Sequence, residues 1–178
     1  MKYLLSFFLF APLLIQAQTT ETWNNFSEDN YAITYPSSWA LDTSGQMGTV
    51  LILFAPSESD SDLFKENINL IIQDIATYKL DLDAYAKLST EQIKTMITNS
   101  KILENKKIKQ GNNEYQKVTY TGDLQSYHLT FEQYYWVTEG KAYVLTFTSE
   151  QSKFKQYKET GEKILNSFAL ASQTPAKK

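Results

Sequence analysis

The sequence predicts an α+β protein in which helices flank an antiparallel sheet. Its last ordered segment, residues 141–168, is typical of a strand that leads directly into an amphipathic helix. Residues 142–148 are mostly β-branched and aromatic, whereas the apolar residues of 154–168 recur at spacings of three and four. Turns with Gly and Asn separate the neighbouring strands upstream, which favours hairpins over parallel βαβ units. A one-sided helix needs an apolar face to cover, so we expect it to pack on this sheet.

The strands are indicated by the alternation of large apolar with smaller side chains, and their ends by residues that interrupt this alternation. Tyr31, Ile33 and Tyr35 alternate with smaller side chains, and Pro36 then ends the strand because it lacks an N–H. The nearly all-apolar run at 49–55 is typical of a central strand covered on both faces. The expected strands are 23–26, 31–35, 39–42, 49–55, 67–75, 101–109, 114–122, 127–138 and 142–148.

Two helices are expected, at 82–97 and 154–168. Asp81 or Asp83 could cap the first, and a Ser89–Gln92 pair inside it could mark a break. Gly161 lies within the apolar stripe of the second helix, where the lack of a side chain would allow close approach to the sheet at a helix-propensity cost of about 1 kcal/mol.

The first 17 residues have the pattern of a secretory signal peptide. Lys2 precedes an apolar run at 4–15, and the segment ends on Ala17. The run is too short for a permanent membrane span. We expect residues 1–17 to be a signal peptide, 18–25 a flexible segment, 26–170 a single domain and 171–178 a disordered tail.

Composition narrows the class of protein further. The chain has 178 residues, no cysteine and a net charge of −3. Without cysteine there can be no disulfide, thiolate metal site, cysteine nucleophile or lipid-modified cysteine anchor. A weakly acidic chain without a basic cluster argues against nucleic acid and anionic membranes as partners. An exported domain without disulfides suits a bacterial periplasm or secretion, with no stable membrane anchor after signal cleavage.

Several segments together resemble the PsbP-like superfamily, which includes PsbP, DcrB and Mog-type domains. The resemblance is carried by Tyr35-Pro36 with Trp39, by the strand at 143–147 and by Ser167-Phe168, and it covers about residues 26–168. It implies an α/β/α sandwich around an antiparallel sheet. It also implies a non-catalytic accessory or binding protein, because the superfamily shares no catalytic motif and its members mostly bind proteins. We therefore expect an exported bacterial member that contacts an unknown protein partner in the cell envelope, without cofactor or metal.

His128 is the only histidine, so a Ser-His-Asp hydrolase would have to use it. Glu132 lies on the same face of the expected strand, near enough to pair with His128 if the strand is regular. The alternative is a half-exposed histidine bonded to a cross-strand neighbour. No GxSxG, HExxH or phosphate-binding glycine loop is present in the sequence, so we expect no enzyme activity.

Glu58, Asp60 and Asp62 offer carboxylates at alternate positions, as a calcium loop does. The segment lacks the later glycine and the bidentate glutamate of such a loop. Two interpretations remain open, a cation site and a solvated acidic loop.

Tyr134, Tyr135 and Trp136 are consecutive, so a strand must place them on both faces. If Tyr135 joins Phe131 beneath a helix, then Tyr134 and Trp136 lie on the other face. There they either pack in the core or, if no helix covers them, form an aromatic patch for a small ligand or a glycan. Tyr134, Trp136 and His128 are the candidate binding residues.

Overall fold

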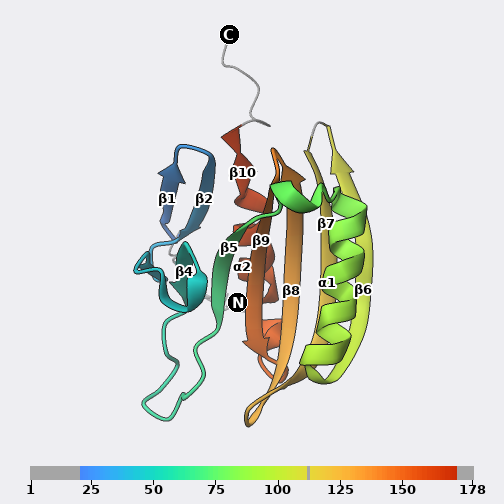
Figure 1. Cartoon of the computed structure of the whole chain (residues 1–178). Helices are drawn as coiled ribbons and strands as arrows, with labels where there is room; N and C mark the ends of the chain where they lie inside the picture. Colours follow the sequence, from blue (N-terminus) through green and yellow to red (C-terminus); the bar gives the residue numbers. More distant parts are fainter. Residues whose placement is uncertain (1–20, 112, 172–178) are drawn as a thin grey trace, which may run out of the picture.

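In the computed structural model, which describes residues 21–111 and 113–171, an antiparallel sheet lies between two helices (Figure 1). Helix α1 (Leu82–Met96) packs over β6, β7 and β8 on one face, whereas α2 (Phe154–Ser167) packs against β9 and β2 on the other. This arrangement confirms the predicted α+β class. The strands are β1 (Trp23–Glu28), β2 (Tyr31–Pro36), β3 (Ala40–Asp42), β4 (Leu51–Phe54), β5 (Asn67–Asp74), β6 (Thr98–Gln110), β7 (Asn113–Leu124), β8 (Tyr127–Thr138), β9 (Lys141–Glu150) and β10 (Ala169–Leu170). Short 3-10 helices lie at Gln46–Gly48 and Ala76–Tyr78.

The large sheet has seven strands in the order β3-β4-β5-β9-β8-β7-β6, with every pair antiparallel. The strands β6 to β9 form a meander of three hairpins. Between β8 and β9 the turn consists of Glu139 and Gly140, with φ values of 51° and 71°. Two consecutive positive φ values give the primed turn whose twist matches a two-residue hairpin. The strand β4 is buried on both faces as predicted, although it lies next to the edge.

A second, three-stranded sheet in the order β1-β2-β10 was not predicted. In it, β2 pairs with β1 on one side and with β10 on the other, and Pro36 is the last residue of β2 as predicted. The prediction that residues 18–25 form a flexible segment is wrong for Trp23–Asn25, which pair with β2. The predicted signal peptide and residues 172–178 of the predicted tail lie outside the described residues. No helix among the described residues has the length and apolar character needed to cross a membrane.

Single residues explain where α1 begins and how closely α2 packs on the sheet. The Asp81 side chain accepts a hydrogen bond of 2.8 Å from the Ala84 N–H and so caps α1, which then runs through Ser89 without a break. Gly161 lies against the Phe147 ring in α2, where an added Cβ would come within 2.8 Å of two ring carbons. The predicted close approach of this helix to the sheet is confirmed.

The core consists of two apolar clusters, one on each face of the large sheet. Tyr134 and Trp136 belong to the cluster beneath α2, which the small sheet also joins. Phe131 and Tyr135 belong to the cluster beneath α1. The alternation predicted for the aromatic run is therefore confirmed, and both of its faces are covered.

Candidate functional site

The aromatic candidates are core residues. Tyr134 is 2% exposed and Trp136 is 1% exposed. The Trp136 ring lies 4.8 Å from the Phe168 ring, between centroids, and its Nε1 donates to Asn113 Oδ1 at 2.9 Å. Tyr115 stacks on Tyr134 at 4.8 Å. Of the two alternatives, packing in the core is therefore confirmed and an exposed aromatic patch is excluded, because Phe168 at the end of α2 and the β6–β7 hairpin enclose these rings.

His128 lies on the surface, with its side chain 77% exposed. Its Nδ1 is 2.6 Å from Asp123 Oδ1, directly across the β7–β8 ladder. This agrees with the alternative of a histidine bonded to a cross-strand neighbour, although the side chain is more than half exposed. Pairing with Glu132 is excluded, because four residues along a strand separate two side chains by about 13 Å, whereas cross-strand neighbours are about 5 Å apart. Hydrogen bonds from Asn99 and from His128 lower the pKa of Asp123.

A hydrolase would need a hydroxyl hydrogen-bonded to this imidazole. Ser126 and Ser152 line the same shallow hollow as His128. Among the residues that the structure describes, Asp123 is the only hydrogen-bond partner of the ring. The geometry therefore offers a surface hydrogen bond between His128 and Asp123, and no support for an assembled nucleophile and base.

Glu132 instead belongs to a buried ion cluster beside α2. Its Oε1 is 3.0 Å from Lys117 Nζ, which is also 2.9 Å from Glu162 and 3.6 Å from Glu104. The Glu132 side chain is 1% exposed. Burial raises its pKa, and Lys117 partly offsets that effect. Burial alone would lower the pKa of Lys117, but the neighbouring carboxylates Glu162 and Glu132 keep it above its usual value. The cluster anchors α2 to β7 and β8.

The acidic segment is held by Lys153 at the start of α2. Lys153 Nζ lies 2.7 Å from Asp62, 3.3 Å from Glu58 and 3.4 Å from Glu150. Tyr157 also donates to Glu58, at 2.8 Å. Glu58 and Asp62 therefore belong to a loop docked on Lys153, whose single charge offsets part of theirs. The interpretation as a solvated loop fits the exposed Glu58 but not the partly buried Asp62. Asp60 is exposed.

These contacts change the acidity of the loop. The hydrogen bond from Tyr157 lowers the pKa of Glu58, and the hydrogen bond from Lys153 lowers that of Asp62. Glu66 is buried beneath them, and burial raises its pKa. No group of three or more acidic or histidine side chains within the described ranges is placed to hold a metal ion.

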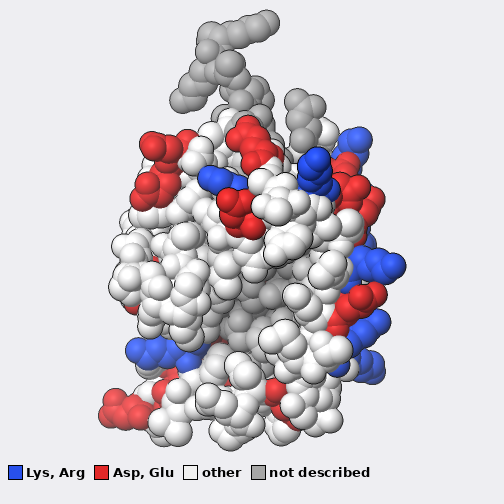
Figure 2. Space-filling view, in the orientation of Figure 1, with Lys and Arg blue, Asp and Glu red and all other residues white. Residues whose placement is uncertain are grey.

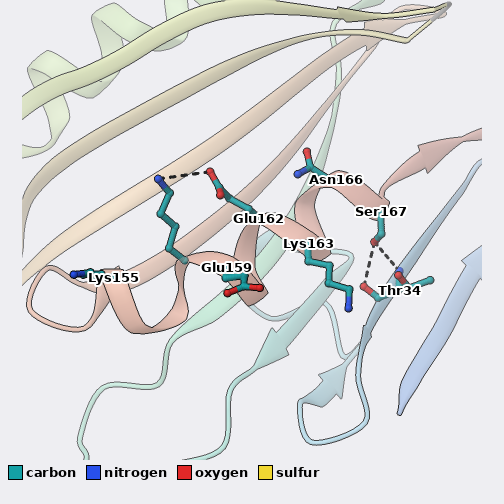
Figure 3. Close-up of a pocket in the computed structure, with 8 residues that line it drawn as sticks. Thr34, Lys155, Glu159, Glu162, Lys163, Asn166 and Ser167 are labelled. Carbon is teal, nitrogen blue, oxygen red and sulfur yellow. Dashed lines mark hydrogen bonds and ion pairs between the residues drawn. The ribbon is translucent and has the colours of Figure 1, made fainter. Parts of the chain in front are cut away.

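A hollow of about 820 Å³ lies along the outer side of α2 (Figure 3). The Ser167 hydroxyl donates to the Thr34 carbonyl at 3.1 Å and accepts from the Thr34 N–H at 2.9 Å, which ties α2 to β2. Lys155 and Lys163 point in different directions in this view. The charged side chains do not converge, so this hollow has no defined binding centre.

The opposite face carries the best candidate, a groove between α1 and the sheet with a volume of about 370 Å³. Figure 2 shows that the middle of this face is hollowed and uncharged, with the charged side chains around its margin. Side chains of β5, β7, β8 and β9 form the floor: Ile71, Gln73, Tyr120, Gln133, Tyr135 and Val144. One side and the end of α1 form the wall: Tyr85, Ser89, Gln92, Ile93, Met96 and Ile97.

Hydrogen bonds fix the polar groups of this groove. Tyr85 Oη donates to Gln73 Oε1 at 2.7 Å and so joins α1 to β5 across one end. Tyr135 donates to Gln133 Oε1, and Gln133 Nε2 donates to Thr146 at 3.1 Å. Burial raises the pKa of Tyr85 and of Tyr135, so their hydroxyls are neutral throughout the physiological pH range. None of the twelve described residues that line the groove carries a charge.

The fold and these clusters define a two-helix sandwich whose ionic groups serve packing and whose open groove is uncharged. The PsbP family model matches residues 21–170. The chain therefore belongs to the PsbP family.

Solved structures show the same fold at low sequence identity. The solution structure of cyanobacterial PsbP (CyanoP) from Synechocystis sp. PCC 6803 is 15% identical, with a TM-score of 0.59 over 86% of this chain and 95% of that chain. LpqN of Mycobacterium tuberculosis, described as involved in cell envelope biogenesis, is 11% identical, with a TM-score of 0.56 over 88% and 92%. A Pseudomonas aeruginosa protein described as a putative regulator, PA94, is 11% identical, with a TM-score of 0.56 over 88% and 97%. A comparison with curated protein sequences gave no match.

Proposed function

We propose that this chain is an exported, non-catalytic accessory protein that binds another protein in the cell envelope through the groove beside α1. The groove is the observation on which the proposal rests. Its polar side chains are held in place by hydrogen bonds on the sheet, beside apolar side chains, and none of them takes part in an internal ion pair. Membership of the PsbP family supports an accessory role.

The ionisable clusters favour binding over catalysis. Lys117 and Lys153 each form ion pairs with several surrounding carboxylates. A catalytic acid or base needs access to a substrate, whereas Glu132 is enclosed between the sheet and α2. The signal-peptide pattern of residues 1–17 supports export, and the partner would then lie in the envelope or outside the cell.

Site-directed crosslinking in native envelopes tests the proposed function. A benzophenone amino acid at Gln92, on the exposed rim of the groove, should give one stoichiometric crosslinked species. The same probe at Lys155, on the outer side of α2, serves as the matched control and should not give it. A chain that stays monomeric and without crosslinks from Gln92 under these conditions would contradict the proposal.

A further inference from the structure

We infer that the groove beside α1 binds an uncharged, extended peptide segment of the partner. This inference rests on the proposed function and adds the chemistry and shape of what is bound. Three properties of the groove support it: its charge, its shape and the kind of hydrogen-bonding groups on its rim.

The charge of the groove favours a neutral ligand. The lining residues are uncharged, although charged residues make up 21% of the sequence. A partner that brought a charge into this hollow would lose hydration without gaining an opposite charge. Burial also raises the pKa of Tyr120, so the floor stays neutral.

The shape of the groove favours an extended chain over a helix. The wall runs from Tyr85 to Met96, which corresponds to about 17 Å along α1 at 1.5 Å per residue. That length accommodates about five residues of extended peptide at 3.3 Å each. The floor residues Tyr120, Tyr135 and Val144 are only 4%, 1% and 8% exposed. A helix of about 10 Å diameter would contact the sheet over a broad strip, and so little exposed floor offers it few contacts.

The polar groups favour a peptide backbone. A side-chain amide offers a donor and an acceptor together, as a peptide group does. Gln73 and Gln92 are exposed on opposite sides of the groove, one on β5 and the other on α1. Gln73 Oε1 already accepts from Tyr85, so Gln73 offers its Nε2 donor, whereas Gln92 can offer both groups. Between them, Ile71 and Val144 of the floor and Ile93 of the wall provide an apolar surface for an uncharged side chain.

Peptide selection with the full-length protein tests this inference. The probe is an immobilised library of neutral peptides of about eight residues, with a matched library that carries Lys or Glu at the central positions. We expect neutral peptides to be selected, and we expect a central charge to weaken the binding of each selected peptide by at least about tenfold in fluorescence anisotropy.

Two variants place the binding in the groove. Ser89→Trp fills it and Gln92→Lys brings a charge to its rim, and each should weaken binding by at least about tenfold. The controls are Leu88→Trp and Thr95→Lys, at exposed α1 positions outside the lining, and both should bind as the wild type does. Since Gln92 is exposed, Gln92→Lys remains informative even if Ser89→Trp fails to fold.

Several results would overturn the inference. These are the selection of charged peptides, the selection of no peptide, binding of an uncharged oligosaccharide alone, or full binding by Gln92→Lys. If the Gln92 variant still captures the same envelope partner as the wild type, the proposed protein-binding function stands and the groove assignment fails. If the wild type captures no partner, the proposed function itself fails.

Discussion

The indole of Trp136 is enclosed by the rings of Tyr115 and Phe168, and its N–H is bonded to Asn113. Replacement by alanine would leave a cavity in the cluster beneath α2. We expect Trp136→Ala to lower the free energy of unfolding by about 3–5 kcal/mol, measured by urea denaturation.

Tyr78 provides the matched aromatic control, because it is 72% exposed. Tyr78→Ala should change the free energy of unfolding by less than about 0.5 kcal/mol. A change of that small size in Trp136→Ala would mean that the indole lies on the surface, contrary to the structure.

Single residues differ in how far the sequence predicts their roles. The Asp81 cap and the close packing of Gly161 depend on neighbours within one element, so local spacing was enough to predict them. Lys117 and Glu132 are fifteen positions apart and meet only because β7 and β8 pair in one register. No local pattern in the sequence encodes that contact, and for the same reason the sequence does not identify Asp123 as the cross-strand partner of His128.

At the scale of elements, Lys153 holds the loop between β4 and β5 against the start of α2. We expect Lys153→Ala to release this loop, because Glu58 and Asp62 would then repel each other and the buried Glu66 without a cation. Hydrogen exchange in residues 57–66 should become roughly tenfold faster or more, while exchange in β8 and β9 stays slow.

Lys155 is the control, because it is an exposed lysine in the first turn of α2 and lies outside this cluster. Lys155→Ala should leave the loop protected. Equal exchange in both variants would show that apolar contacts, such as Phe64 against Tyr127 at 5.0 Å, hold the loop without the lysine.

Helices and strands whose apolar residues recur with a strong period were predicted well. The strand at 127–138 has the predicted bounds, and both helices lie where their apolar stripes place them. The division into two sheets was not predicted, because alternation does not reveal which strands pair. The groove was missed because its α1 residues recur at the same spacing as the residues of a helix face that is fully covered by a sheet. These residues are Tyr85, Ser89, Ile93 and Met96. Its existence depends on α1 covering only part of the sheet.

At the scale of the whole molecule, two sets of carboxylates give opposite contributions to stability as pH changes. The lowered pKa values of Glu58 and Asp62 mean that their contribution is present above their ordinary pKa values, 4.5 and 3.8, and is lost as pH falls. The raised pKa of Glu132 means that its contribution is present below pH 4.5 and is lost as pH rises through the raised value.

We therefore expect Glu132→Gln to gain stability relative to the wild type as pH rises from about 4.5 to 8, measured by denaturation at each pH. Lys117→Met should instead lose about 3–5 kcal/mol at neutral pH, because it leaves Glu132 buried without a cation. The loss should shrink at low pH, where Glu132 takes up a proton.

The double variant Lys117→Met/Glu132→Gln is the control for this pair, and it should recover part of the loss at neutral pH. A stability difference between Glu132→Gln and the wild type that does not vary with pH would show that Glu132 keeps its ordinary pKa in the folded protein.

The pairing of β2 with β10 has a consequence for the order of folding. It joins Ala32 to Ala169, near the two ends of the described chain. The hairpins from β6 to β9 need only short loops, so they have a low entropic cost of closure and are free to form first. The pairing of β10 with β2 requires almost the whole chain to be in place, and we expect it to be the last part of the fold to assemble.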